Sequence, residues 1–163
     1  MAKAKGGKGN CLRIIGGEWR SRRLSFPDVE GLRPTPDRVR ETLFNWLQGR
    51  IEGARCLDLY AGSGALGLEA LSRGAAEAVF VDSDTRVARC LEENLTLLGS
   101  PRGGRVIRSD VLNYLRGGGR AFDFVFLDPP FRHGLLEPTL RLLAQGGWLA
   151  PKAWIYLESE SGV

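Results

Sequence analysis

The chain has 163 residues, of which 43% are hydrophobic and 26% charged, and its formal net charge is +4. These values are typical of a soluble globular protein, and the length favours one domain with a sizeable core. The first ten residues lack the apolar stretch of a secretory signal, no apolar run is long enough to span a membrane, and the single histidine, His133, excludes histidine-based metal clusters and Ser-His triads. We therefore expect a cytoplasmic protein without a metal site, and we interpret its three widely spaced cysteines as reduced thiols.

The N-terminal segment, residues 1–31, has the composition of a basic arm. Residues 1–23 hold seven Lys and Arg residues against a single Glu. We expect residues 12–15 and 18–20 to pair as a β-hairpin across the Gly-Gly turn between them. Cationic side chains beside an aromatic ring suit a phosphate backbone, although a basic tail can also serve only to keep a chain soluble. The residues predicted to contact such a backbone are Arg13, Trp19, Arg20, Arg22, Arg23 and Arg33.

A helix is predicted from residue 36 to about residue 48. Thr35 suits the N-cap, Pro36 suits the first helical position, and Gly49 ends the helix. Its apolar side chains recur at helical spacing and are expected to form one buried face. These side chains are Val39, Leu43, Trp46 and Leu47.

From residue 55 onward the sequence alternates between strand and helix patterns. This alternation predicts an α/β fold, a doubly wound and mostly parallel sheet of Rossmann-like type, which occupies residues 32–163 as one domain. Ligands of such sheets bind outside the carboxyl ends of the strands. Strands are predicted near residues 55–59, 77–82, 104–109, 122–128 and 153–158, and helices near residues 64–73, 84–98, 111–115 and 133–145.

A glycine-rich turn follows the strand predicted at residues 55–59. Gly62, Gly64 and Gly67 have the spacing of a dinucleotide-binding turn, and Asp82 ends the next strand, where an acid that binds a ribose belongs. Glycine lets the backbone turn tightly and lets a ligand approach, and the helix N-terminus behind the turn offers unpaired N–H groups. The pattern predicts a ribose-bearing cofactor, and by itself it also allows an NAD(P)-dependent oxidoreductase.

Acidic residues end three successive predicted strands, at Asp58, Asp82 and Asp110. A carboxylate beside the glycine turn repels a pyrophosphate and attracts an ammonium or sulfonium group, so the pattern favours S-adenosylmethionine. The alternative is that Asp82 or Asp84 caps the helix that follows, and that Asp110 caps the short helix after it. The residues predicted to bind the cofactor are Asp58, Tyr60, Gly62, Gly64, Asp82, Ser83, Asp110 and Val111.

The fourth predicted strand runs into the sequence Asp128-Pro129-Pro130-Phe131. The two prolines offer carbonyl acceptors without N–H donors, and they stiffen the loop. A rigid pocket of acceptors beside an aromatic ring suits a planar group that carries an amino group, such as a nucleobase. A strand end with a packed ring is the simpler alternative. We predict that these four residues are catalytic.

These motifs resemble the bacterial 16S ribosomal RNA guanine-N2 methyltransferases of the RsmD type, a class I family that uses S-adenosylmethionine. The resemblance covers nearly the whole chain from residue 12, through RIIGGEWR, LRPT, DRVRETLFNWL, DLYAGSGALGLEALSRGA and DPPFRHGLL. It implies methylation of one guanine of 16S ribosomal RNA, in the small ribosomal subunit or its late precursor. We expect Asp128 and the Pro129 carbonyl to accept the N2–H bonds of the base, and Phe131 to stack on it.

Members of this family usually continue beyond the strand predicted at residues 153–158 and form two further strands. We therefore expect those strands to be absent here and the chain to be C-terminally truncated. We also expect a monomer whose strand at 153–158 is an exposed sheet edge prone to self-association. Two alternatives stay open, an NAD(P)-dependent oxidoreductase and a non-catalytic RNA-binding assembly factor of methyltransferase fold.

Overall fold

The computed structural model describes residues 10–29, 32–129 and 134–158. Two predicted catalytic residues, Pro130 and Phe131, lie outside these ranges. No helix within them is long and apolar enough to cross a membrane. The elements, in chain order, are β1 (Cys11–Arg13), β2 (Arg23–Ser25), α2 (Asp37–Trp46), β3 (Arg55–Leu59), α3 (Ala65–Ser72), β4 (Glu77–Asp82), α4 (Thr85–Leu97), β5 (Gly104–Arg108), α5 (Val111–Arg116), β6 (Phe122–Leu127), α6 (Leu136–Gln145) and β7 (Leu149–Leu157).

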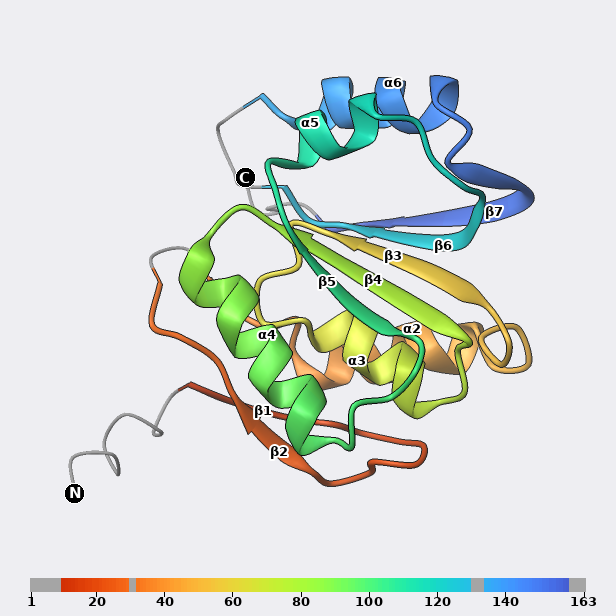
Figure 1. Cartoon of the computed structure of the whole chain (residues 1–163). Helices are drawn as coiled ribbons and strands as arrows, with labels where there is room; N and C mark the ends of the chain where they lie inside the picture. The colour runs from red at the N-terminus through yellow and green to blue at the C-terminus, as the bar shows by residue number, and fades with distance from the viewer. Residues whose placement is uncertain (1–9, 30–31, 130–133, 159–163) are drawn as a thin grey trace.

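The five longer strands form one parallel sheet, in the order β5-β4-β3-β6-β7. Helices α2, α3 and α4 lie on one side of this sheet together with β1 and β2, and α5 and α6 lie on the other side (Figure 1). The predicted doubly wound α/β fold is therefore confirmed. The order of the strands reverses between β3 and β6, and the carboxyl ends of strands at such a point are where these folds bind ligands.

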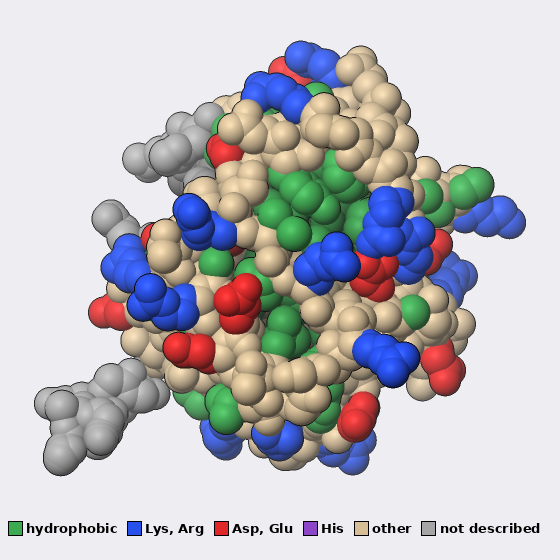
Figure 2. All heavy atoms as spheres, viewed as in Figure 1, with side chains coloured by type: hydrophobic (Ala, Val, Ile, Leu, Met, Phe, Trp, Pro, Cys, Tyr) green, Lys and Arg blue, Asp and Glu red, His purple; other side chains and the backbone are tan. Residues whose placement is uncertain are grey.

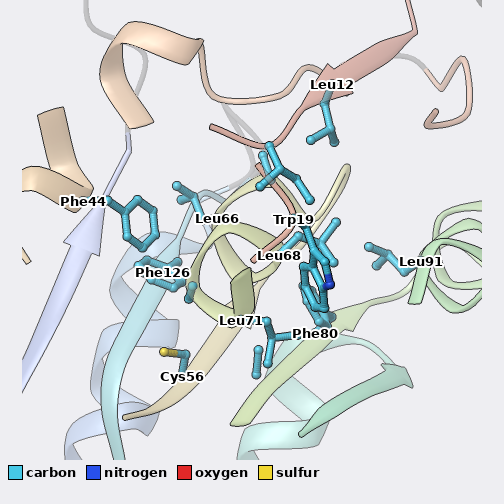
Figure 3. Packing of buried hydrophobic residues seen from close by; sticks show 14 of the residues in the cluster. Leu12, Trp19, Phe44, Cys56, Leu66, Leu68, Leu71, Phe80, Leu91 and Phe126 are labelled. Carbon is cyan, nitrogen blue, oxygen red and sulfur yellow. The ribbon is translucent and has the colours of Figure 1, made fainter. Parts of the chain in front are cut away.

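Two hydrophobic clusters fill the two sides of the sheet. The larger one joins the face that includes Phe80 and Phe126 to α3 and to the N-terminal arm, and Figure 3 shows Trp19, Leu68 and Leu91 within it. The smaller one joins the opposite face of the sheet to α5 and α6. Central strands that are buried on both faces need continuous apolar runs, which explains why these strands could be recognised in the sequence.

The N-terminal arm differs from its prediction. β1 pairs with β2, with Arg13 opposite Arg23, so the connecting turn spans residues 14–22 and the Gly-Gly pair is not a hairpin turn. Gly17 has φ +82°, and a Cβ there would lie 2.0 Å from the carbonyl oxygen of Ser72. Gly17 is therefore needed for close packing of the arm against the end of α3.

A buried carboxylate fastens this arm to α3. Glu69 has no exposed surface, and its two oxygens accept hydrogen bonds from the backbone N–H groups of Ile15, at 3.0 Å, and Gly16, at 2.8 Å. They also accept from Arg40 Nη1 at 3.2 Å and from Arg73 Nε at 2.8 Å. The charge of Glu69 is thus matched by two guanidinium groups, which a fully buried carboxylate requires.

The start of α2 and half of its predicted buried face were predicted incorrectly, while Leu43 and Leu47 are buried as predicted. Pro36 occupies the N-cap position, while the hydroxyl of Thr35 donates to Glu158 Oε1 at 2.9 Å instead of capping the helix. Val39 and Trp46, both predicted as buried, are 37% and 77% exposed. Arg40, in contrast, is buried, because its guanidinium has partners inside the protein.

Strand β7 begins at Leu149, four residues earlier than predicted, and pairs with β6 alone among the described strands. It is therefore the edge strand of the described sheet. Three of its apolar side chains are exposed, namely Trp154, Ile155 and Leu157.

Candidate functional site

Four carboxylates converge at the carboxyl ends of neighbouring strands. Asp58 lies within β3, Asp82 ends β4, Asp128 follows β6 and Glu158 follows β7. The negative charges of the other three all raise the pKa of Asp58, so the four groups lie close enough to interact. The structure thus brings together two acids predicted for the cofactor and one predicted for catalysis, at the point where the strand order reverses.

Asp58 is the most buried of these acids. Its Oδ2 accepts a hydrogen bond from the backbone N–H of Gly67 at 3.0 Å. Burial raises its pKa well above the ordinary value, the hydrogen bond from Gly67 opposes that rise, and the neighbouring acids add to it. Such a region of negative potential stabilises a cation. An ammonium or sulfonium group fits these surroundings, and a pyrophosphate does not.

The turn after β3 adopts the unusual backbone that its glycines permit. Gly62 and Gly64 have φ of +56° and +78°, and Tyr60 has φ +57°, although it is not a glycine. A Cβ at Gly64 would lie 2.4 Å from the side chain of Leu91, so that glycine is needed for packing as well. Gly62 is open by comparison, because a Cβ there would come no closer than 3.7 Å to another group, the side chain of Leu32. The backbone at Gly62 is therefore accessible to a ligand.

Asp82 connects this turn to the beginning of α4. Its Oδ2 accepts from the N–H of Gly62 at 3.0 Å, and its Oδ1 accepts from the N–H of Asp84 at 3.0 Å. Asp84 is the residue that caps α4, because its side chain accepts from the N–H groups of Arg86 and Val87. Each Asp82 oxygen keeps a second lone pair that can accept a ribose hydroxyl.

We expect Asp82→Ala to lower the affinity for S-adenosylmethionine by about tenfold to a hundredfold, since a hydrogen bond to a charged group contributes about 1.5–3 kcal/mol. The helix should persist because Asp84 still caps it. Titration calorimetry with the cofactor measures the affinity, and Asp84→Ala is the matched control, which should reduce the melting temperature more than the affinity. An Asp82→Ala protein with normal affinity and a lower melting temperature would assign Asp82 to structure alone.

Asp110 behaves as the capping alternative predicted. Its Oδ2 accepts from the N–H of Asn113 at 3.0 Å and caps α5, and its side chain is exposed. The side chain of Val111 is buried in the smaller hydrophobic cluster, so only its backbone could meet a ligand. Ser83 is exposed beside Asp82. A cofactor role for these three residues stays a prediction.

Asp128 and Glu158 are neighbours at the ends of β6 and β7. The N–H of Glu158 donates to the carbonyl oxygen of Leu127 at 3.0 Å, which holds residue 158 beside residue 128. Partial burial and then the charge of Glu158 raise the pKa of Asp128 to about 6. Glu158 was missed as a candidate, although it ends the fifth predicted strand just as the other acids end theirs.

Tyr60 links the glycine turn to α6. Its hydroxyl lies 2.9 Å from Thr139 Oγ1, and Thr139 Oγ1 lies 2.6 Å from the carbonyl oxygen of Leu135. Because Thr139 has one hydroxyl proton and Leu135 offers only an acceptor, Tyr60 is the donor to Thr139. This contact joins the turn at the end of β3 to the helix that follows the Asp128 loop.

Most of the arginines predicted to contact a phosphate backbone are exposed. Arg20, Arg22, Arg23 and Arg33 lie on the surface, and Lys and Arg side chains line the lower margin of the face in Figure 2, where Figure 1 places β1 and β2. The exposed Arg13 forms an ion pair with Asp37 at 3.1 Å.

The prediction for Trp19 was wrong. Its side chain is only 7% exposed and belongs to the larger hydrophobic cluster, so its ring is not available to stack on a base. Its backbone N–H donates to Ser72 Oγ at 2.9 Å, which holds this part of the turn against α3. Among the residues that the structure describes, no group of three or more His, Cys, Asp or Glu side chains could hold a metal ion.

Comparison with known proteins extends these observations. A family model described as Conserved hypothetical protein 95 matches residues 12–163. Ribosomal RNA small subunit methyltransferase D of Escherichia coli (strain K12) is 56% identical over 149 residues, which cover 91% of this chain and 75% of that protein. The protein of the same name from Haemophilus influenzae is 49% identical over 152 residues, covering 91% of this chain and 79% of its own.

A solved structure of the Escherichia coli protein yhhF has a similar fold. It superposes with a TM-score of 0.86 at 54% identity, covering 94% of this chain and 84% of that one. A solved structure of a hypothetical protein from Thermus thermophilus gives a TM-score of 0.80 at 34% identity, covering 93% of this chain and 88% of that one. The matched family region includes every strand whose end contributes an acid to the site.

Proposed function

The chain belongs to the family described as Conserved hypothetical protein 95 and is an RsmD-type class I methyltransferase, and from this membership we propose that it methylates the RNA of the small ribosomal subunit. The observation that carries the proposal is the 56% identity to Ribosomal RNA small subunit methyltransferase D of Escherichia coli across 91% of the chain. The convergence of Asp58, Asp82, Asp128 and Glu158 at the strand ends supplies a site for the reaction.

The residues at the ends of β3 and β4 suit S-adenosylmethionine as the methyl donor. The cofactor supplies a methyl group that is already activated by the sulfonium charge. Asp58 and its acidic neighbours favour the cationic end of such a molecule, and Asp82 offers acceptors for ribose hydroxyls. Gly62 leaves the backbone of the turn open to close approach.

The substrate group that best fits the acceptors after β6, Asp128 and the carbonyl of Pro129, is the exocyclic N2 amine of a guanine. The lone pair of this nitrogen is delocalised into the ring, which makes it a poor nucleophile. Asp128 and the carbonyl of Pro129 follow β6 and would accept the two N2–H bonds, which favours a more tetrahedral nitrogen. Holding the base and the cofactor in one orientation would then provide most of the acceleration. The base has to leave its stack to be reached, which single-stranded or bulged RNA allows at low cost.

Methyl transfer to small ribosomal subunits tests this proposal. Subunits from cells that lack this protein should accept labelled methyl groups from S-adenosylmethionine, and mass spectrometry of nuclease fragments should place the label on N2 of one guanine. Label on another base or on another atom of guanine would refute the guanine-N2 assignment. The absence of any transfer by a protein that binds the cofactor would favour a non-catalytic RNA-binding role.

The pKa of Asp128 predicts how activity depends on pH. The ionised carboxylate accepts N2–H bonds more strongly than the neutral carboxyl does, so kcat/KM should rise with pH and level off above about 6. Because the pKa of this acid is raised from its ordinary value of 3.8, its contribution to folding stability is most favourable at low pH and is lost between about pH 4 and 6. In a pH–rate profile, Glu158→Gln should move the midpoint to lower pH, since the charge of Glu158 contributes to the shift. An unmoved midpoint would assign the titration to another group.

The exposed arginines of the arm predict the salt dependence of RNA binding. Replacing Arg20, Arg22 and Arg23 by Gln should weaken RNA binding and flatten its dependence on salt, by somewhat less than one unit of slope for each lost phosphate contact. The matched control replaces three exposed arginines that lie outside the arm, Arg102, Arg105 and Arg116. If both triple variants alter the slope equally, the arm has no particular role in binding.

A further inference from the structure

Glu158 lies where a second acceptor for the target base would be useful. β6 and β7 are parallel, with Leu127 opposite Leu157, and the N–H of Glu158 donates to the carbonyl oxygen of Leu127. Glu158 therefore leaves the sheet beside Asp128, at the same edge and one strand further out. Its side chain is half-buried.

The carboxylate of Glu158 is held in one orientation by buried groups. Its Oε1 accepts from Thr35 Oγ1 at 2.9 Å, and Thr35 is only 7% exposed. The carbonyl oxygen of Thr35 in turn accepts from Nε of the buried Arg40 at 3.1 Å. Among the side chains that the structure describes, no donor reaches the other oxygen, Oε2. Within the described part of the chain, that oxygen is therefore available to accept a hydrogen bond from a ligand.

The same position carries an electrostatic cost in the free protein. Glu158 raises the pKa of Asp128 and adds to the rise in the pKa of Asp58, so its negative charge disfavours ionisation of both carboxyls. Repelling carboxylates that are held together by fixed hydrogen bonds are typical of sites that receive a donor or a cation. The cationic cofactor offsets the repulsion near Asp58, and a donor from the substrate would offset it near Asp128.

Guanine is the base whose edge supplies that donor. Beside the N2 amine, guanine carries a proton on N1, whereas adenine and 2,6-diaminopurine have a bare N1 that is an acceptor. An ionised carboxylate accepts hydrogen bonds and donates none. It therefore attracts the N1–H of guanine and repels the bare N1 of adenine or 2,6-diaminopurine. A site with such a group rejects a substrate that lacks the matching donor much more strongly than shape alone would.

We propose that Glu158 accepts the N1–H of the target guanine and so determines the specificity of the enzyme for guanine, with Asp128 and Pro129 engaging N2. This inference rests on the proposed function and extends it from the reacting amine to the neighbouring ring nitrogen. Thr35 is then a positioning residue, since it orients Glu158 without meeting the base itself.

Replacement of the target guanine by 2,6-diaminopurine in a synthetic RNA tests the assignment, because this base keeps the N2 amine and loses the N1 proton. We expect the wild-type protein to prefer guanine by about 100-fold or more in kcat/KM. Glu158→Gln can donate from its amide to the bare N1 and can still accept from Thr35, so the preference should fall by at least about tenfold. Glu137→Gln, at an exposed acid on α6, is the matched control and should leave the preference unchanged.

The two proposals fail in different ways in this experiment. If the wild-type protein methylates neither RNA, the proposed function fails. The inference is overturned if the wild-type protein methylates the guanine RNA but shows no preference for it over the 2,6-diaminopurine RNA. It is also overturned if Glu158→Gln lowers kcat/KM for the two RNAs by the same factor, because Glu158 then does not recognise N1.

Discussion

Asp128→Ala is expected to lower kcat by at least about 100-fold, which is the lower end of what a positioned acid–base or electrostatic group contributes in enzymes. Asp128 follows β6 and is proposed to engage the substrate, whereas Asp82 and Asp58 accept hydrogen bonds from Gly62 and Gly67. Affinity for S-adenosylmethionine should therefore stay within a few-fold of wild type. Single-turnover methyl transfer and titration calorimetry measure the two quantities separately.

Asp128→Asn is the informative companion of this variant. The amide oxygen can still accept one N2–H bond, so we expect a smaller loss of kcat than with alanine. The amide does not titrate, so the rise of activity with pH that is assigned to Asp128 should disappear. An alanine variant that transfers methyl groups at a nearly normal rate would show that Asp128 does not engage the reacting amine.

The strands and their order along the chain could be predicted because their signals are local. Each central strand is a short apolar run that ends in a polar residue, and strand–helix alternation leaves few arrangements other than a doubly wound sheet. The acids at Asp58, Asp82 and Asp128 could be located by the same logic, since parallel strands end at one edge. Glu158 obeys this logic as well, since it follows β7 at the same edge of the sheet.

Several of the errors concern partners that are distant in the sequence. Hydrophobic periodicity predicted Trp46 as buried and could not identify Arg40 as buried, because the carboxylate that pairs with it, Glu69, lies 29 residues away. The turn between β1 and β2 is shaped by Ser72, and Thr35 is drawn away from its helix by Glu158, 123 residues later. Local capping and turn preferences are too weak to outweigh such contacts.

The interactions of Glu69 predict the largest change in stability. Glu69→Ala removes the acceptor for two backbone N–H groups and leaves the guanidinium of Arg40, which is 1% exposed, without its buried partner. Breaking a buried ion pair on one side costs about 3–5 kcal/mol in free energy of unfolding. Urea unfolding measures this loss as a lower midpoint. Amide hydrogen exchange at Ile15 and Gly16 should also become faster, because their donors lose their acceptors and the arm is released from α3.

Glu137→Ala is the matched control, because Glu137 pairs with Arg141 at the same i,i+4 spacing at which Glu69 pairs with Arg73. Both members of the control pair are exposed, so its loss should cost no more than about 0.5 kcal/mol. The difference in free energy of unfolding between the two variants then measures what burial and the contacts with the arm add to an ordinary i,i+4 ion pair. If Glu69→Ala unfolds at the same urea concentration as Glu137→Ala, the arm is held by its apolar contacts, through Trp19 and Leu12, and the buried network contributes little to stability.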